Sequence, residues 1–330
     1  MHTGNALLEI KDLYVRFKVF EGELSVLNGV NLEIYEGEKV GLVGETGCGK
    51  TTTIKSVLRV LPSPPARITG GEIFYRGRDI LKLKKRELPG IRRGEISAIF
   101  QDPLTSLNPV FTVGVQLQDI IKQSLRQQGM EGVSKKEIRS RAAMLLKETG
   151  MPDPERILKS YPIQLSGGMR QRVCISEALR VTVKLLLADE PTTNLDVTIQ
   201  DQILRRLDEL VEKRRTSVLF ITHSLGVVKT LTHRVYIMYA GNIVETAQTE
   251  ELFAHPLHPY TRGLLKTVPK LTGEGFSEGI RGRIPNYLNP PEGCRFHPRC
   301  EHTMDICSRQ KPSFFNMEEG HKVACFLYRR

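Results

Sequence analysis

The chain has 330 residues, 40% hydrophobic and 26% charged, which is typical of a globular protein with one large domain and an appendage, or with two domains. No apolar run approaches the roughly 18 residues that a membrane-spanning helix needs, and the N-terminus has no signal-peptide pattern, so we expect a cytosolic protein. The net charge of +11 would suit nucleic acid or an anionic membrane, but no aromatic residues alternate with the basic clusters as in a platform for stacked bases.

The N-terminal part is predicted to form β-strands. Apolar residues alternate with mostly polar neighbours from Leu7 to Phe17, and the segment from Val26 to Ile34 has a similar pattern. A shorter strand, Glu72 to Tyr75, follows the pair Gly70-Gly71. These segments predict an antiparallel β layer around the motif described next.

A phosphate-binding loop is the motif around which the chain is organised. The apolar run Val40 to Val43 precedes it, and a helix from Thr51 to Val60 is expected after it. The pattern G-x-x-x-x-G-K-[ST] comprises Gly44, Glu45, Thr46, Gly47, Cys48, Gly49, Lys50 and Thr51. The glycines let backbone N–H groups and a helix N-terminus face anionic oxygens, Lys50 adds charge for the β- and γ-phosphates, and Thr51 offers a hydroxyl to Mg²⁺.

The middle of the chain is predicted to be mostly helical. A short strand, Ile96 to Phe100, ends at Gln101 and is followed by a loop of turn-forming residues from Asp102 to Pro109. Helical periodicity then extends from Val113 to about Leu158, with a second helix over about Lys135 to Glu148. We interpret this stretch as an all-helical insertion.

A second anion-binding helix and two buried strands follow. Ser166 occupies the N-cap position of a helix that continues to Leu179, and its N-terminus favours anions. The strand Lys184 to Ala188 ends in Asp189-Glu190, and the strand Ser217 to Thr222 ends in His223. Strands separated by helices predict a parallel sheet, in which ligands bind at the carboxyl ends of the strands.

The last third begins with short elements. Strands are expected over Val235 to Met238 and Ile243 to Glu245, and helices over about Thr249 to Ala254 and Thr261 to Thr267. The segment from Gly273 to Pro291 is rich in Gly and Pro and is predicted to be a linker or surface loop.

Four of the six cysteines lie in the tail. Cys294, Cys300, Cys307 and Cys325 have the spacing C-x5-C-x6-C-x17-C, which matches neither common zinc sites nor ferredoxins. In a cytosolic chain this crowding favours a metal over disulfides. Four thiolates would suit Zn²⁺ or an iron–sulfur cluster, and a metal would stabilise a short tail that can bury little core.

Together, these motifs resemble those of the ATP-binding-cassette ATPases over residues 1 to about 250. The resemblance rests on the phosphate-binding loop followed, in order, by Gln101, Leu165-Ser166-Gly167-Gly168, Asp189-Glu190, Asp196 and His223. Three segments and the tail are more specific, and are similar to those of the ATPase subunits of oligopeptide, dipeptide and nickel importers. These segments are 100–109, 165–172 and 255–260.

The resemblance implies a fold and a domain division. It implies an α/β fold with a P-loop NTPase core of RecA-like type, an antiparallel β subdomain, a helical insertion and a small metal-stapled C-terminal extension. The nucleotide-binding domain would span residues 1–255, with its helical subdomain at about 102–164, and the extension would span 256–330.

The resemblance also implies the role of each site residue. Phe17 would stack on adenine, residues Gly44 to Thr52 would hold the phosphates, and Thr51 and Gln101 would complete the Mg²⁺ shell with Asp189 behind them. Glu190 would activate the attacking water and His223 would contact the γ-phosphate. The stretch formed by Ser166, Gly167 and Gly168 would contact the nucleotide of a second subunit, with Asn194, Leu195 and Asp196 along the same seam.

The implied function is hydrolysis of ATP to power the import of dipeptides or oligopeptides, at the cytoplasmic face of the membrane. The implied partners are a second cassette ATPase (a paralogue is favoured, a homodimer is the alternative), two membrane permease subunits and, indirectly, an extracellular substrate-binding protein. Nucleic acid is not expected. Some relatives carry a [4Fe–4S] cluster in the tail, which favours that cofactor over zinc held with help from His297, His302 or His321.

Three alternatives stay open at this point. Besides a peptide importer subunit, these are a nickel importer ATPase, a soluble cassette ATPase that acts on nucleic acid, and a P-loop kinase. The positive charge allows the second, and the Ser166-Gly167-Gly168 stretch and His223 argue against the third.

Overall fold

The computed structural model describes residues 5–180, 183–193, 195–267, 279–318 and 320–329. Contacts divide the chain into two compact units. Unit 1 comprises residues 1–82 and 220–330, and unit 2 comprises residues 83–219. Strand β8, Ser217–Thr222, begins in unit 2 and ends in unit 1.

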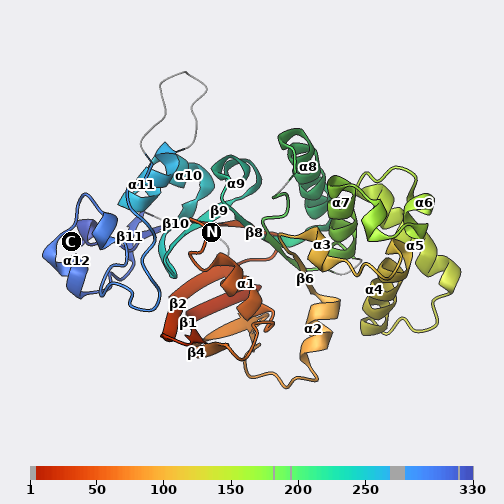
Figure 1. The fold of residues 1–330 in the computed structure, drawn as a ribbon, viewed down its shortest axis with the longest axis horizontal. Coiled ribbons are helices and arrows are strands. Elements are labelled where there is room, and N and C mark those ends of the chain that lie inside the picture. Colours follow the sequence, from red (N-terminus) through yellow and green to blue (C-terminus); the bar gives the residue numbers. More distant parts are fainter. Residues whose placement is uncertain (1–4, 181–182, 194, 268–278, 319, 330) are drawn as a thin grey trace. The chain divides into compact units, whose positions relative to one another are not determined.

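Unit 1 contains an antiparallel sheet in the order β2-β1-β4-β5, drawn in red to orange in Figure 1. Its strands are β1 Leu8–Val19, β2 Gly22–Ile34, β4 Ala66–Tyr75 and β5 Arg78–Asp79. This confirms the predicted β layer. Strand β4 is longer than predicted and includes Gly70 and Gly71. A Cβ on Gly71 would lie 2.3 Å from the carbonyl oxygen of Asp12, so the close approach of β4 to β1 requires glycine.

A second sheet of unit 1 supports the phosphate-binding loop. It has the order β11-β12-β10-β9-β3, and the end of β8 continues it beyond β3. Strands β3 Lys39–Val43 and β9 Arg234–Tyr239 are parallel, whereas β10 Asn242–Gln248, β11 Phe315–Glu318 and β12 His321–Val323 pair antiparallel with their neighbours. Unit 1 also contains, before the short helices of the tail, α1 Lys50–Val57, α9 Leu225–Leu231, α10 Thr249–Ala254 and α11 Pro259–Lys266.

Unit 2 combines a parallel strand pair with helices. Strand β6 Ile96–Ile99 pairs in parallel with β7 Leu185–Asp189. The helices are α2 Leu88–Gly94, α3 Pro103–Ser106, α4 Val113–Gln127, α5 Lys135–Glu148, α6 Pro154–Lys159, η1 Pro162–Gln164, α7 Gly167–Ala178 and α8 Val197–Arg214. The predicted helical stretch is confirmed, but the predicted loop at 102–109 contains α3.

Polar caps explain where three of these helices begin. The side chain of Thr112 accepts a hydrogen bond at the start of α4, Ser134 at the start of α5 and Asp153 at the start of α6. Such caps satisfy backbone N–H groups that have no partner within the helix. Behind them, Leu117, Ile121 and Leu125 of α4 form a stripe at most 1% exposed, which packs against α5 and α6.

The C-terminal tail is anchored by ordinary packing. Strands β11 and β12 extend the sheet of unit 1 through β10, with Glu245 opposite Val323. Phe296 is 3% and Val323 0% exposed, and the short helices η2 His297–Arg299, α12 Asp305–Arg309 and η3 Phe326–Tyr328 complete the tail. The prediction that a metal stabilises the tail is not supported, since strand pairing and buried apolar side chains anchor it.

Most predicted element ends agree with the structure within a few residues. Helix α10 and strand β8 have the predicted bounds, while α1 ends at Val57 rather than Val60. Part of the predicted linker, residues 273–278, lies outside the described residues, and residues 279–291 have no regular structure. Within the described part of the chain, no helix is both long and apolar enough to cross a membrane.

Candidate functional site

The phosphate-binding loop lies between β3 and α1 of unit 1, as its motif predicts. Gly47 and Gly49 have φ values of +85° and +114°, in the left-handed region that glycine tolerates. A Cβ on Gly44 would lie 2.1 Å from the carbonyl oxygen of Met238, so this glycine lets the loop lie directly on β9. Cys48 is buried, and burial raises the pKa of its thiol, which therefore remains protonated.

Lys50 is held against the loop itself. Its side chain is buried, and Nζ donates to the carbonyl oxygens of Gly44 at 2.6 Å and Glu45 at 3.0 Å. Thr51 and Thr52 follow in the first turn of α1, where Thr51 is exposed. An ammonium group fixed at a glycine-rich helix N-terminus is the arrangement that binds the phosphates of a nucleotide.

Unit 2 provides the acidic part of the site, at the end of β7. Asp189 is 3% exposed, and Glu190 follows with φ of +48°. Gln101 Nε2 donates to Glu190 Oε2 at 3.1 Å, and Thr193 Oγ1 donates to the same oxygen at 2.8 Å. The structure thus brings together Gln101 and Glu190, which the sequence placed at the ends of separate strands. Thr193 was missed because it belongs to no recognised motif.

The predicted second anion site is the N-terminus of α7. Ser166 is the N-cap, and its Oγ accepts a hydrogen bond from Met169 N–H at 3.3 Å, which confirms the predicted cap. Ser166 and Gly167 are exposed. One turn later, the buried Gln171 donates to the carbonyl oxygen of Pro191, so α7 is tied to the segment that follows Glu190.

The remaining predicted residues lie at the ends or edges of elements. Asp196 is exposed and precedes α8, and Asn194 lies outside the described residues. His223 is exposed just after β8. Phe17 is half-buried on β1, opposite Leu24 of β2.

The four tail cysteines are close enough to influence one another, but they do not form a ready metal site. Burial first, and then the neighbouring thiols of Cys307, Cys325 and Cys300, together raise the pKa of the Cys294 thiol to about 12. Cys294 N–H also donates to the Cys307 carbonyl oxygen at 2.8 Å. No group of three or more His, Cys, Asp or Glu side chains suited to a metal occurs among the described residues, so the structure gives no support to the predicted [4Fe–4S] cluster.

Two of the histidines considered as zinc ligands, His297 and His321, have protein partners. His321 Nε2 lies 2.9 Å from Glu245 Oε1, and His297 Nδ1 lies 2.9 Å from the carbonyl oxygen of Cys294. These contacts give no support to zinc.

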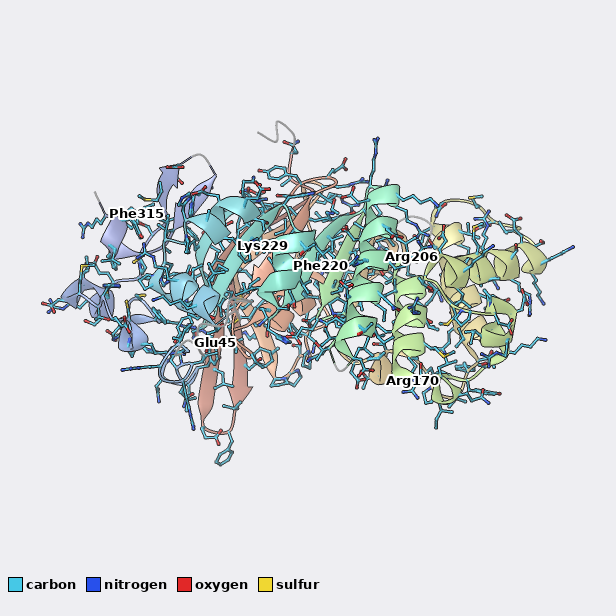
Figure 2. The ribbon with its side chains drawn as sticks, turned by 90° about the horizontal axis from the view of Figure 1, so that it is seen from above. Glu45, Arg170, Arg206, Phe220, Lys229 and Phe315 are labelled. Carbon is cyan, nitrogen blue, oxygen red and sulfur yellow. The ribbon has the colours of Figure 1, made fainter. Side chains whose placement is uncertain are left out.

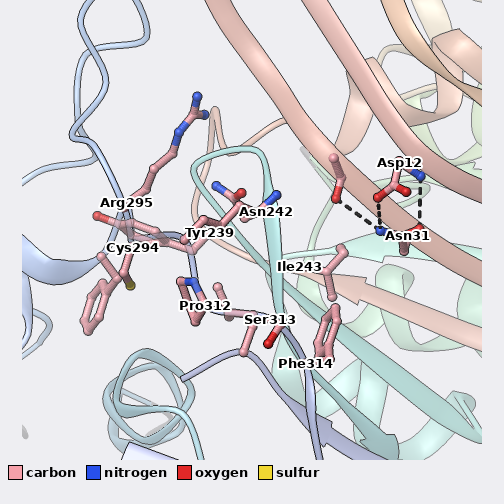
Figure 3. A pocket seen from close by; sticks show the side chains of 16 residues that line it. Asp12, Asn31, Tyr239, Asn242, Ile243, Cys294, Arg295, Pro312, Ser313 and Phe314 are labelled. Atoms are coloured by element: carbon pink, nitrogen blue, oxygen red, sulfur yellow. Dashed lines mark hydrogen bonds between the residues drawn. The ribbon is translucent and has the colours of Figure 1, made fainter. Parts of the chain in front are cut away.

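A cavity of about 380 Å³ lies beside the tail, in unit 1 (Figure 3). Its wall includes Tyr239, Asn242, Cys294 and Phe314, with Asp12 and Asn31 hydrogen-bonded to each other at one side. No residue of the phosphate-binding loop lines it, so this cavity is separate from the phosphate site.

These features define a class of protein. Unit 1 carries a glycine loop with a buried lysine between a strand and a helix, and unit 2 carries a strand-end Asp-Glu pair with a glutamine partner. These are the motifs of a P-loop nucleotide hydrolase.

Comparison with known families identifies the class further. Residues 27–193 match the model of the family described as ABC transporter, and residues 244–307 match that of the oligopeptide/dipeptide transporter C-terminal region. The chain belongs to the ABC transporter ATPases that carry this C-terminal region, and it is an ATPase.

The similarity to curated relatives extends over nearly the whole chain. The chain is 44% identical to the oligopeptide transport ATP-binding protein OppD of Bacillus subtilis over 97% of its own length and 88% of that protein. It is 43% identical to the dipeptide transport ATP-binding protein DppD of the same organism, over 97% and 94%.

A solved structure agrees with the cassette fold. The ATP-binding cassette MJ0796, described as a dimer in a post-hydrolysis state bound to ADP and Pi, is 29% identical. It aligns with a TM-score of 0.65 over 73% of this chain and 98% of its own.

Proposed function

We propose that this chain is the ATP-hydrolysing subunit of an importer for oligopeptides or dipeptides. The observation that carries the proposal is similarity along the full length, including the C-terminal region, to proteins described as oligopeptide and dipeptide transport subunits. The proposed partners are two membrane permease subunits, a second cassette with a paralogue favoured, and an extracellular substrate-binding protein. The chain would work at the cytoplasmic face of the membrane.

The proposed division of labour follows the motifs. Residues 1–255 form the nucleotide-binding domain, with a helical subdomain at about 102–164, and residues 256–330 form the extension. Thr51 and Gln101 would hold Mg²⁺, with Asp189 behind them, and Phe17 would stack on adenine. Bound Mg²⁺ would neutralise charge on the phosphates.

The proposed chemistry needs a base and a charge-stabilising surface. The Glu190 carboxylate takes a proton from the attacking water, and His223 contacts the γ-phosphate. Gly44 to Lys50 hold the phosphates from one side. Ser166, Gly167 and Gly168 face the nucleotide of the second cassette, with Asp196 beside them, so the reaction requires a pair of cassettes.

Reconstitution of the complete transporter tests the transported solute. We expect ATP hydrolysis and uptake to rise with di- to pentapeptides in the presence of the binding protein, and both to be lost in Lys50→Ala. Uptake of Ni²⁺ without peptide would instead make the chain a nickel importer subunit. Steeply salt-dependent binding of DNA or RNA by the chain would support the nucleic-acid alternative.

The [4Fe–4S] cluster is the least supported part of the prediction. It rests on four cysteines whose described arrangement gives no support for a metal. Protein purified without oxygen decides the matter: iron and sulfide in stoichiometric amounts, lost in Cys300→Ser, would support the cluster, and stoichiometric zinc in a colourless protein would exclude it.

A further inference from the structure

Three side chains from the C-terminal extension contact the phosphate-binding loop directly. The backbone N–H of Glu45 donates to the Tyr260 hydroxyl at 2.9 Å, and the Tyr287 hydroxyl donates to the Gly47 carbonyl oxygen at 2.8 Å. Arg299 Nη1 lies 3.1 and 3.0 Å from the two carboxylate oxygens of Glu45. All of these residues belong to unit 1, and Glu45 is labelled in Figure 2.

Each of the three side chains also has a partner in the extension or in β9. For Tyr287 the partner is the Arg295 guanidinium, which lies 5.9 Å from the centre of its ring. Tyr260 is 0% exposed, and its ring lies 4.7 Å from that of Tyr239 and 5.4 Å from that of Phe296. The guanidinium of Arg299 also donates to the carbonyl oxygens of Ile280 and Arg281. Because the Arg299 side chain is 7% exposed, its ion pair with Glu45 is screened less than a surface pair.

The contacts act on a part of the loop where geometry matters. Glycine-rich backbone has many accessible conformations, and binding a phosphate requires one of them. Tyr260 holds the N–H of Glu45, Lys50 holds its carbonyl oxygen, and Tyr287 holds the next-but-one carbonyl. The loop is thereby fixed before nucleotide arrives.

Charge gives a second reason for the ion pair. Glu45 places a carboxylate inside a loop that must accept a highly anionic ligand, where a like charge would repel it. The Arg299 guanidinium faces that carboxylate and compensates it. Without Arg299, both the position and the uncompensated charge of Glu45 would oppose nucleotide binding.

We propose that Arg299, Tyr260 and Tyr287 are positioning residues of the ATPase, through which the C-terminal extension sets the affinity of the phosphate-binding loop for ATP. The extension is thus a working part of the nucleotide site of its own chain. The proposal depends on ATP binding at Lys50 and is independent of which solute is transported.

The test compares variants of the full-length chain in its purified transporter complex. A fluorescent ATP analogue measures the Kd, and steady-state hydrolysis measures KM and kcat. Arg299→Ala should raise the Kd and KM for ATP about tenfold, since an uncompensated carboxylate then faces the phosphates, with kcat at saturating ATP nearly unchanged. Tyr260→Phe and Tyr287→Phe should each raise them about threefold, the effect of one neutral hydrogen bond.

A charge-removing second substitution distinguishes positioning from general loss of structure. Adding Glu45→Gln to Arg299→Ala should restore most of the lost affinity, because the repelling charge is gone. Arg299→Lys should retain part of it, since the charge stays but the paired geometry is lost. A merely misfolded extension would respond to neither change.

Matched controls come from the same extension. Arg262 donates to the Pro256 carbonyl oxygen and to Tyr328, away from the phosphate-binding loop, and Tyr328 donates to Leu257. Arg262→Ala and Tyr328→Phe should leave the Kd for ATP near native. The proposal is overturned if these controls weaken ATP binding as much, if Glu45→Gln fails to rescue, or if Arg299→Ala binds ATP normally. A native chain that binds no ATP would instead overturn the ATPase assignment itself.

Discussion

Glu190 is the residue where backbone strain and hydrogen bonding coincide. Its φ of +48° is costly for a residue with a side chain, by about 1–2 kcal/mol. That conformation is accompanied by donors from Gln101 and Thr193, both directed at one carboxylate oxygen. Strain retained at a strand end beside a polar partner is typical of a catalytic position, and it agrees with the proposed role of this carboxylate as the base.

Replacing this carboxylate by an amide tests that role. Glu190→Gln keeps the size of the side chain but cannot accept a proton, so we expect kcat for ATP hydrolysis to fall by about 100-fold or more. ATP binding should be retained, because the phosphate-binding loop is untouched. Single-turnover hydrolysis and nucleotide retention measure the two effects. Native-rate hydrolysis by this variant would show that another group is the base.

Thr193 serves as a matched substitution at the same carboxylate. Thr193→Val removes the donor and keeps the shape, so a drop in kcat of about threefold to tenfold is expected, far smaller than for Glu190→Gln. An equal drop in both variants would mean that orientation, rather than proton transfer, accounts for the loss.

At the scale of elements, helix α7 connects two parts of unit 2. Its N-terminus presents Ser166 and Gly167, and its buried Gln171 donates to the carbonyl oxygen that follows Glu190. The same helix thus carries the proposed second anion site and contacts the segment that follows the proposed base, Glu190. A movement of α7 would therefore displace Pro191 and, with it, the neighbouring Glu190.

The α7 contact predicts a defined loss of stability. Gln171→Ala leaves the buried Pro191 carbonyl oxygen without its donor and removes packed atoms, so unfolding should become easier by about 1–3 kcal/mol. Thermal unfolding of the variant measures this. Gln123→Ala on α4, where the amide contacts the exposed Asp119, is the control and should change stability by less than about 0.5 kcal/mol.

The contact between β10 and β12 contains a buried titratable pair. Burial alone would raise the pKa of Glu245, but hydrogen bonds with His321 and from the backbone N–H groups of Leu257 and His258 outweigh it and lower the pKa. Burial lowers the pKa of His321, but Glu245 at 2.9 Å and Glu251 at 3.6 Å outweigh it and raise the pKa. Each member of the pair therefore favours the charged form of the other.

This pair gives the tail a stability that depends on pH. The His321 contribution is complete below its unfolded pKa near 6.5 and is lost as pH rises through the raised folded value. The Glu245 contribution is complete above its unfolded pKa near 4.3 and is lost as pH falls through the lowered folded value. We expect the Tm of the native chain to exceed that of His321→Gln most between these limits, at mildly acidic pH.

The comparison requires melting curves over a series of pH values. The difference in Tm between native protein and His321→Gln should shrink as pH rises above the raised pKa of His321. His302→Gln changes an exposed histidine of the same tail and should show no such trend. A difference that stays constant with pH would mean that the histidine contributes packing rather than charge.

How much of the fold and of the candidate site could be predicted depended on how far apart the contacting residues lie in the sequence. The phosphate-binding loop, the Ser166 cap and the strand end at Glu190 are local patterns, and each was confirmed where the structure describes it. Tyr260 reaches Glu45 across 215 positions, and no local pattern encodes such a contact. The tail was misjudged for the same reason: composition suggested too little core, whereas Val323 is buried by pairing with a distant strand.

In the proposed pair of cassettes, the N-termini of α1 and α7 of one chain contact two different nucleotides. The α1 end serves the nucleotide of its own chain, and the α7 end serves the nucleotide of the second cassette. At the start of α8, which contacts α7, Val197 is 82% exposed, as suits a surface that is covered only when cassettes meet. The pairing proposal therefore predicts that a substitution at the α7 end lowers ATP hydrolysis without weakening ATP binding.

Ser166→Arg tests that separation, because it places a bulky cation on the exposed α7 end and leaves the phosphate-binding loop intact. The separate chain should bind ATP with nearly native Kd, while hydrolysis by the transporter complex falls at least about tenfold. Lys50→Ala should lose both. Ser134→Arg on α5 alters another exposed N-cap serine with an equivalent hydrogen bond, and it should leave hydrolysis unchanged. If Ser166→Arg weakened ATP binding by the separate chain as severely as Lys50→Ala, the α7 end would act within its own chain and hydrolysis would need no second cassette.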